Sequence, residues 1–129
     1  MLKIGWASRD VSTNEPVGIT GQAYERISSG SVDPTTVTVL LMEDGKDQVV
    51  FISGDFTSIT AQLLKEVKAA VQVKAHEVMV EKILFNATHT HSSPRYQETA
   101  RYDYAPRIEW TIITPTNTVP FWWSRYPMR

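Results

Sequence analysis

The sequence predicts an α/β fold in which a mixed sheet contains a β-hairpin and a right-handed βαβ unit. Two apolar strands, 35–43 and 48–53, flank the turn-forming residues 44–47, a pattern that is typical of a hairpin. A segment with helical spacing of apolar residues then separates the second arm from another apolar run, 82–85. Strand, helix and strand in this order form a βαβ unit, whose crossover is almost always right-handed.

The first element is a short strand, 2–8, in which Leu2, Ile4 and Trp6 share one face. Residues 9–33 follow as a long loop that is rich in glycine, serine, proline and asparagine. Loops of this length in compact domains are often functional. In the hairpin, the second arm is apolar on both faces, which predicts a central place in the sheet.

The predicted helix follows Gly54 and Asp55 and fades near Lys74. Thr57 or Ser58 is the predicted N-cap, because a hydroxyl side chain there accepts a hydrogen bond from the first turn. Charged side chains fall on the face opposite the apolar stripe. The stripe consists of Ile59, Leu63, Leu64, Val67, Ala70 and Val71.

The composition limits the classes of protein and of site. The 129-residue chain has 42% hydrophobic and 21% charged residues and a formal net charge of -1, which indicates one globular domain and gives no reason to expect nucleic acid as a partner. No cysteine is present, so a zinc site would use histidine, carboxylate or tyrosine ligands. The sequence shows neither a leader pattern nor a span of about 20 apolar residues, so we expect a cytoplasmic protein without a transmembrane segment.

His89 and His91 follow the last apolar run and are the residues that point to chemistry. Because alternate residues of a strand point to one side, both imidazoles point the same way if the extended conformation continues. Two imidazoles directed at one point suit a zinc-type ion. The alternative is a polar turn that holds two hydrogen-bonded imidazoles.

Asp55 ends the strand before the helix, so its side chain should emerge at the same sheet edge as His89, where open α/β sheets bind ligands. It serves either as a turn or capping carboxylate or as a group that supports a ligand or contacts the substrate. His76 is expected in a solvated connector, and Tyr24 and Arg26 have either a surface role or a substrate role. Further carboxylates without metal spacing are Glu98, Asp103 and Glu109.

The segment 83–94 resembles the neutral/alkaline non-lysosomal ceramidase family, which carries a similar strand followed by a Thr-His-Thr-His-Ser-Gly-Pro type motif. Here the motif reads Thr-His-Thr-His-Ser-Ser-Pro, from Thr88 to Pro94. The opening strand and 9–13 also resemble the family's first strand and its Asp-Ile-Thr-Pro turn. The resemblance covers about 1–95, because further matching segments follow in the same order as in the family. They are 21–26, Gly30, 33–34 and 53–55.

The resemblance implies hydrolysis of an N-acyl amide by a water that zinc polarises. It makes His89 a zinc ligand and His91 a neighbouring active-site histidine that contacts the reacting group. A protonated imidazole at His91 would stabilise the oxyanion or give a proton to the leaving amine. Asp55 falls at the family's acidic position on the sheet edge. Ser93 replaces the family's usual glycine, a change that would narrow the pocket without touching the ligands.

The family's remaining zinc ligands come far downstream of this motif: a second histidine, a glutamate and a tyrosine. So does its serine-bearing loop. No histidine follows His91 in this chain. We therefore expect an α/β fragment of a larger catalytic domain, which alone binds zinc weakly or not at all and is inactive.

We divide the chain into a ceramidase-like α/β segment, 1–95, and an irregular tail, 96–129. Reading 121–123 with the codons displaced by two bases necessarily gives Leu-Val, and 110–117 can then encode a tyrosine-rich segment that contains glutamate. Such a run leading into Phe-Leu-Val-Glu-Gln resembles the helix that continues these ceramidase-like proteins. We hypothesise that a frameshift from about Trp110 truncated a longer enzyme.

The sequence thus predicts a truncated ceramidase-like zinc-dependent amidohydrolase. The partner of the parent enzyme would be an N-acyl amide or a sphingolipid-like small molecule. The alternative is a non-catalytic α/β domain whose His-x-His binds a metal or an anion opportunistically. A third interpretation is a fragment that needs a second polypeptide to complete its site, which predicts an exposed apolar sheet face and self-association.

Overall fold

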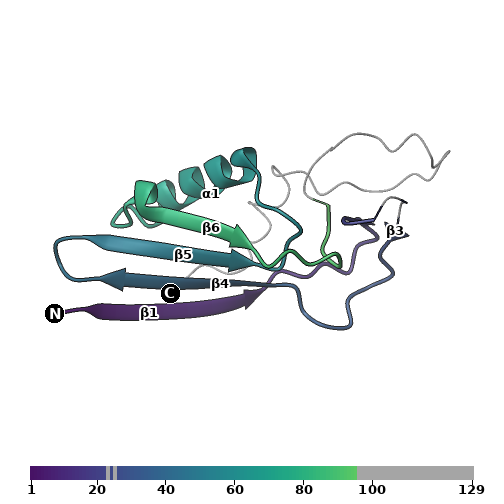
Figure 1. The fold of residues 1–129 in the computed structure, drawn as a ribbon, viewed down its shortest axis with the longest axis horizontal. Helices are drawn as coiled ribbons and strands as arrows, with labels where there is room; N and C mark the ends of the chain where they lie inside the picture. The colour runs from purple at the N-terminus through teal and green to yellow at the C-terminus, as the bar shows by residue number, and fades with distance from the viewer. Residues whose placement is uncertain (23, 25, 96–129) are drawn as a thin grey trace.

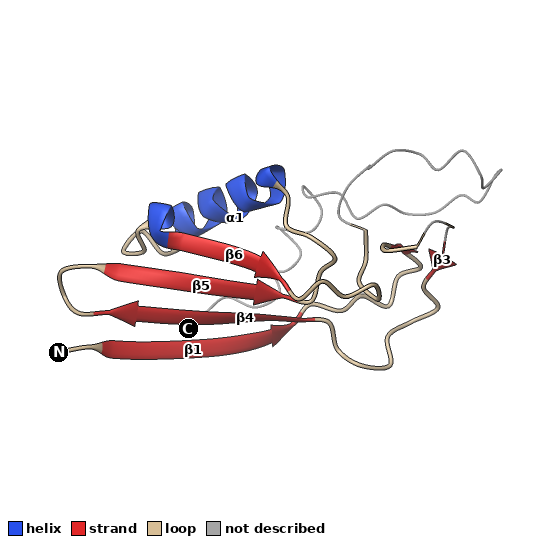
Figure 2. Ribbon diagram, viewed as in Figure 1, coloured by secondary structure: helices blue, strands red, loops and turns tan. Residues whose placement is uncertain are grey.

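The computed structural model describes residues 1–22, 24 and 26–95. In this part of the chain, a four-stranded sheet carries one α-helix, and a small two-stranded sheet lies beside it (Figures 1 and 2). The elements are β1 (Lys3–Asp10), β2 (Gly18–Ile19), β3 (Arg26–Ile27), β4 (Thr36–Glu43), β5 (Gln48–Gly54), α1 (Ala61–Lys74), the 3-10 turn η1 (Val80–Lys82) and β6 (Ile83–Ala87).

The large sheet has the strand order β1-β4-β5-β6 and is mixed. β4 pairs antiparallel with both β1 and β5, whereas β5 pairs parallel with β6 across the crossover helix. The predicted α/β fold, with its hairpin and its βαβ unit, is confirmed, and β5 has the central place that its apolar faces predicted. Figure 1 shows β1, β5 and β6 ending at the same edge, beside which the β2–β3 pair lies.

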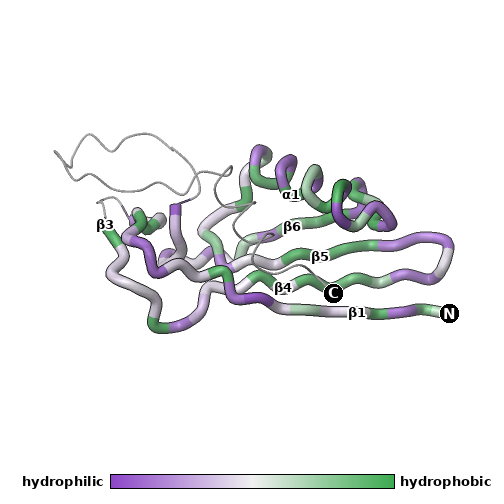
Figure 3. The backbone as a smooth tube through the Cα atoms, turned by 180° about the vertical axis from the view of Figure 1, so that it is seen from behind, coloured by the Kyte–Doolittle hydropathy of each residue, from purple (hydrophilic) through white to green (hydrophobic). Residues whose placement is uncertain are grey.

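One face of the sheet is covered by α1 and forms the main core. Val50, Ile52 and Ile83 point to this face, and Val71 packs onto them from the helix. Figure 3 shows the hydrophobic stretches of β5 and β6 that run alongside α1. The helix is therefore held by burial of its apolar stripe, as its sequence periodicity predicted.

The helix begins later than predicted. Its N-cap is Thr60, whose hydroxyl accepts from the Leu63 amide, so the assignment of Thr57 or Ser58 as N-cap was wrong. Tertiary contacts delay the start of the helix. Phe56 is fully buried, and the Thr57 hydroxyl donates to a backbone carbonyl on a distant segment. Residues 55–59 are thus held as a loop before the helix starts. The C-terminal end, at Lys74, agrees with the prediction.

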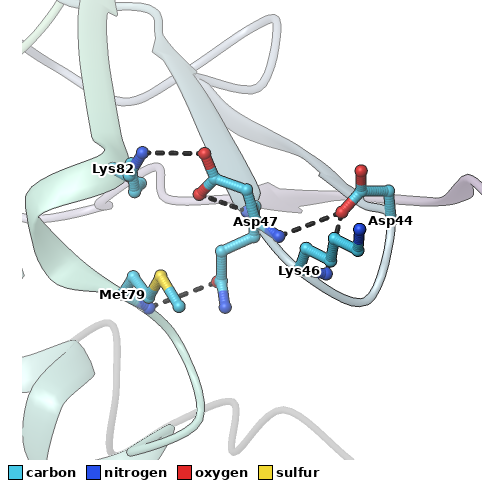
Figure 4. Close-up of polar contacts among 6 residues, drawn as sticks. Asp44, Lys46, Asp47, Met79 and Lys82 are labelled. Atoms are coloured by element: carbon cyan, nitrogen blue, oxygen red, sulfur yellow. Dashed lines mark hydrogen bonds and ion pairs between the residues drawn. The ribbon is translucent and has the colours of Figure 1, made fainter.

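The hairpin turn is joined to the start of β6 (Figure 4). Asp44 accepts hydrogen bonds from two backbone amides of the turn, and the Asp47 carboxylate meets the Lys82 ammonium at 2.9 Å. Gln48 accepts from the Met79 amide at 3.2 Å. The Asp47 and Gln48 contacts thus hold the segment just before β6 against the end of the hairpin turn.

The other face of the sheet carries an exposed apolar row that crosses all four strands. Trp6 pairs with Leu40, Leu40 with Phe51, and Phe51 with Leu84. Trp6 is 75% exposed and Leu84 is 55% exposed. The exposed apolar face that the sequence predicted is therefore present, and self-association through it stays a prediction. No helix in the described part of the chain is both long and apolar enough to cross a membrane.

Phe56 is the side chain that ties the loop before α1 to the sheet. It is fully buried, and its ring meets Phe85 edge-on with centroids 6.1 Å apart. We expect Phe56→Ala to lower the free energy of unfolding by about 3–5 kcal/mol, because the truncation leaves a cavity there. Chemical denaturation at low protein concentration measures this loss.

Phe51→Ala is the matched control, because Phe51 is 39% exposed on the uncovered face. Its loss of stability should be clearly smaller. Equal losses for the two variants would contradict the central place given to Phe56.

Candidate functional site

The site forms where β5 and β6 end side by side. Their parallel pairing places Gly54 opposite Ala87. Beyond the strands, the Thr88 amide donates to the Gly54 carbonyl at 2.9 Å and the Thr90 amide donates to the Phe56 carbonyl at 3.2 Å. The segment that carries the two histidines is therefore held against the loop that follows β5.

His89 lies just past the strand and has a left-handed backbone, with φ of 64°. The extended conformation ends at Ala87, so the strand alternation on which the sequence argument relied does not apply here. Its ring Nδ1 lies 2.7 Å from the Thr57 carbonyl oxygen. Because a carbonyl can only accept, Nδ1 carries the proton, and in the neutral ring the lone pair is on Nε2.

The two imidazoles nevertheless lie together. The ring centroids of His89 and His91 are 5.2 Å apart, in an edge-to-face arrangement with an interplanar angle of 69°. Both residues are exposed. The predicted juxtaposition is present, but loop hydrogen bonds rather than strand geometry produce it.

His91 is held by the long loop that precedes β4. Gly21 has a φ of +98°, and a Cβ at this position would overlap the imidazole of His91. The Arg26 guanidinium donates to the His91 carbonyl, while the Tyr24 side chain is exposed. Only glycine combines this backbone angle with this close approach. In the sequence, Gly21 marks only a loop and part of the resemblance, so its contact with His91 was missed.

The same loop also pairs with the residues after the histidines. The Arg95 amide donates to the Gly18 carbonyl at 2.8 Å, and the Thr20 amide donates to the Ser93 carbonyl at 3.2 Å. Ser93 is fully buried, and its hydroxyl has no hydrogen-bond partner among residues 1–22, 24 and 26–95. A buried hydroxyl without a partner costs stability, and a glycine would carry no such group. Narrowing of a pocket by Ser93 stays a prediction.

Asp55 is engaged in local hydrogen bonds. One carboxylate oxygen accepts from the Thr36 amide and hydroxyl, and the other accepts from the Thr88 hydroxyl at 3.1 Å. The Thr36 hydroxyl is the main reason that the pKa of Asp55 lies below its usual value, and partial burial opposes it. These contacts are those of a positioning carboxylate next to the histidine segment. A catalytic role for Asp55 stays a prediction.

Among the described residues, the orientation of His89 is compatible with metal binding, but no complete set of ligands surrounds it. His89 presents Nε2 while a backbone carbonyl holds its other nitrogen, the arrangement usual for a histidine that binds a metal. No group of three or more histidines and carboxylates able to hold a metal occurs within the part of the chain that the structure describes. His76 lies in the connector after α1 with its side chain 88% exposed, and Glu98, Asp103 and Glu109 lie outside the described residues.

The chain matches no protein-family model and no curated protein. Its fold is similar to that of two solved structures, the neutral ceramidase from Pseudomonas aeruginosa with a TM-score of 0.67 and a ceramidase complexed with C2 with a TM-score of 0.66. Both are 23% identical to this chain, and each match covers 74% of this chain and 16% of the other. The resemblance noted in the sequence is thus confirmed at the level of the fold.

The depressed pKa of Asp55 makes a contribution to stability that depends on pH. A carboxyl group with a lowered pKa in the folded state stabilises the fold fully above its unfolded pKa, and this stabilisation is lost as the pH falls through the folded pKa. We expect Asp55→Asn to lower the free energy of unfolding by about 1 kcal/mol at neutral pH, because the amide cannot accept all three hydrogen bonds. The difference from the wild type should narrow as the pH falls below about 4.

Urea denaturation at several pH values measures this difference. Asp33→Asn, in an exposed loop, controls for the change in net charge. A difference between Asp55→Asn and the wild type that stays constant down to pH 2 would contradict the assignment.

Proposed function

We propose that this chain is the amino-terminal part of a ceramidase-like zinc-dependent amidohydrolase whose parent enzyme hydrolyses an N-acyl amide. The observation that carries the proposal is the pair of adjacent imidazoles on a ceramidase-like fold, in which His89 is oriented by a backbone carbonyl. The substrate class is an N-acyl amide or a sphingolipid-like small molecule. A cytoplasmic location also stays a prediction.

The three candidate residues have different roles in this proposal. His89 binds the metal through Nε2, and a bound zinc ion would supply a polarised water. His91, whose backbone carbonyl accepts from Arg26 and whose ring centroid lies 5.2 Å from that of His89, would stabilise the oxyanion or give a proton to the leaving amine. Asp55 acts at the sheet edge, where its hydrogen bond to Thr88 supports the residue before His89.

The chain alone should be inactive, because a catalytic zinc site has three protein ligands as a rule. The chain spans 16% of the length of the two ceramidases that it resembles in fold. The rest of the ligand set must then come from residues outside the part of the chain that the structure describes. This incompleteness also supports the prediction that zinc binds weakly.

A non-catalytic domain with an opportunistic His-x-His is the second candidate. The observation that favours it is the short separation of the two exposed rings, both of which carry nitrogens of a type that binds metal ions. In this case His89 and His91 contribute equally to binding, whereas in the ceramidase-like site only His89 is a ligand.

Zinc titration of single-histidine variants separates the two candidates. We expect His89→Ala to abolish the binding measured by isothermal titration calorimetry, and His91→Ala to reduce it clearly less, because His91 lies outside the proposed ligand set. His76→Ala, in the exposed connector, is the matched control and should bind like the wild type.

Equal losses in His89→Ala and His91→Ala would favour the opportunistic site. Zinc binding that survives His89→Ala unchanged would contradict both candidates. Full amidase activity of the chain alone, on any N-acyl amide, would contradict its proposed status as an inactive fragment.

A further inference from the structure

We propose that Thr57 is the positioning residue of His89, and that its hydroxyl keeps the imidazole in the tautomer with the proton on Nδ1. The inference deepens the proposed function, because its relevance to zinc rests on His89 being the ligand. The tautomer itself can be measured without any metal.

Thr57 holds the histidine segment at two points. Its carbonyl accepts from His89 Nδ1 at 2.7 Å, and its hydroxyl donates to the Thr90 carbonyl at 2.9 Å. The two bonds act on consecutive residues of the segment. The hydroxyl bond therefore adds to the backbone bond from the Thr90 amide to the Phe56 carbonyl in setting how close the Thr57 carbonyl lies to the ring.

The protons of the neighbouring hydroxyls can be assigned from these contacts. The single proton of the Thr57 hydroxyl is used on the Thr90 carbonyl, so in its close contact with the Thr20 hydroxyl Thr57 must accept. The other acceptor near Thr20 Oγ1, the Ser93 carbonyl, is 3.4 Å away. Thr20, Thr57 and the Thr90 carbonyl thus form a directed chain that connects the long loop to the histidine segment.

His89 needs such external support. Its left-handed backbone is unfavourable for a residue with a Cβ, and the residue is exposed, so local packing does not fix the ring. A neutral imidazole without a partner exchanges between two tautomers. With the proton held on Nδ1, the lone pair stays on Nε2, the nitrogen available to a metal ion.

The test uses the full chain, free of metal and labelled with nitrogen-15, at about pH 8.5, where histidine is neutral. Long-range proton–nitrogen spectra report which ring nitrogen of His89 carries the proton. We expect the Nδ1-protonated form to predominate in the wild type and in Thr57→Ser, which keeps the hydroxyl. Thr57→Val, which is isosteric but lacks the hydroxyl, should show a mixture of tautomers.

Thr38→Val is the matched control, because the Thr38 hydroxyl bonds Ser8 on the sheet, outside the Thr57 contacts. It should leave the His89 spectrum unchanged. Backbone amide signals of β5 and β6 show whether each variant is folded. In a zinc titration, Thr57→Val should bind about 10–100-fold more weakly than the wild type, the usual cost of losing a group that orients a ligand.

A wild-type spectrum in which the proton is on Nε2 would overturn the inference, even if Thr57→Val fails to fold. So would a folded Thr57→Val with the wild-type tautomer, or a Thr57→Ser that behaves like Thr57→Val. If the tautomer changes as expected but zinc binds equally well after His89→Ala, the inference about Thr57 stands and the proposed role of His89 as a ligand fails. If His89 binds zinc but its tautomer is the same in the wild type and in Thr57→Val, the proposed role of His89 stands and the inference about Thr57 fails.

Discussion

The parallel pairing of β5 with β6 determines where every candidate residue lies. Because both strands run in the same direction, their carboxyl ends meet at one edge, with Gly54 opposite Ala87. The backbone bonds from Thr88 and Thr90 to the loop after β5 continue this pairing beyond the sheet. Helix α1 makes the pairing possible, since a parallel connection needs a crossover, and burial of its apolar stripe on β5 and β6 holds the unit together.

The regular parts of the fold were accessible from local sequence patterns. The hairpin, the central place of β5 and the end of α1 at Lys74 follow from turn residues and apolar periodicity. The start of α1 was not accessible, because Phe56 and Thr57 are held by tertiary contacts that local propensity does not report. The hypothesis of a frameshift and the division at 95 concern residues outside the described part.

The site was only partly predictable. The sequence placed His89, His91 and Asp55 at one edge, and the structure brings the two imidazoles within 5.2 Å of each other. The sequence could not show that the backbone of His89 is left-handed, nor that Arg26 donates to the His91 carbonyl, 65 residues away along the chain. Strand alternation correctly predicted that His89 and His91 are neighbours, but the strand ends at Ala87, so alternation is not what brings them together. The length of the glycine-bearing loop 9–33 predicted a functional role for it, but could not predict which residues it contacts.

The proposed site depends on the proximity of the two imidazoles, which nuclear Overhauser spectroscopy measures. In a chain labelled only at histidine, we expect a cross-peak between ring protons of His89 and His91, because their ring centroids lie 5.2 Å apart. The exposed His76 should show no such cross-peak to either ring. A folded protein with intact contacts between β5 and β6, but without a cross-peak between the two imidazoles, would contradict this arrangement of the two histidines.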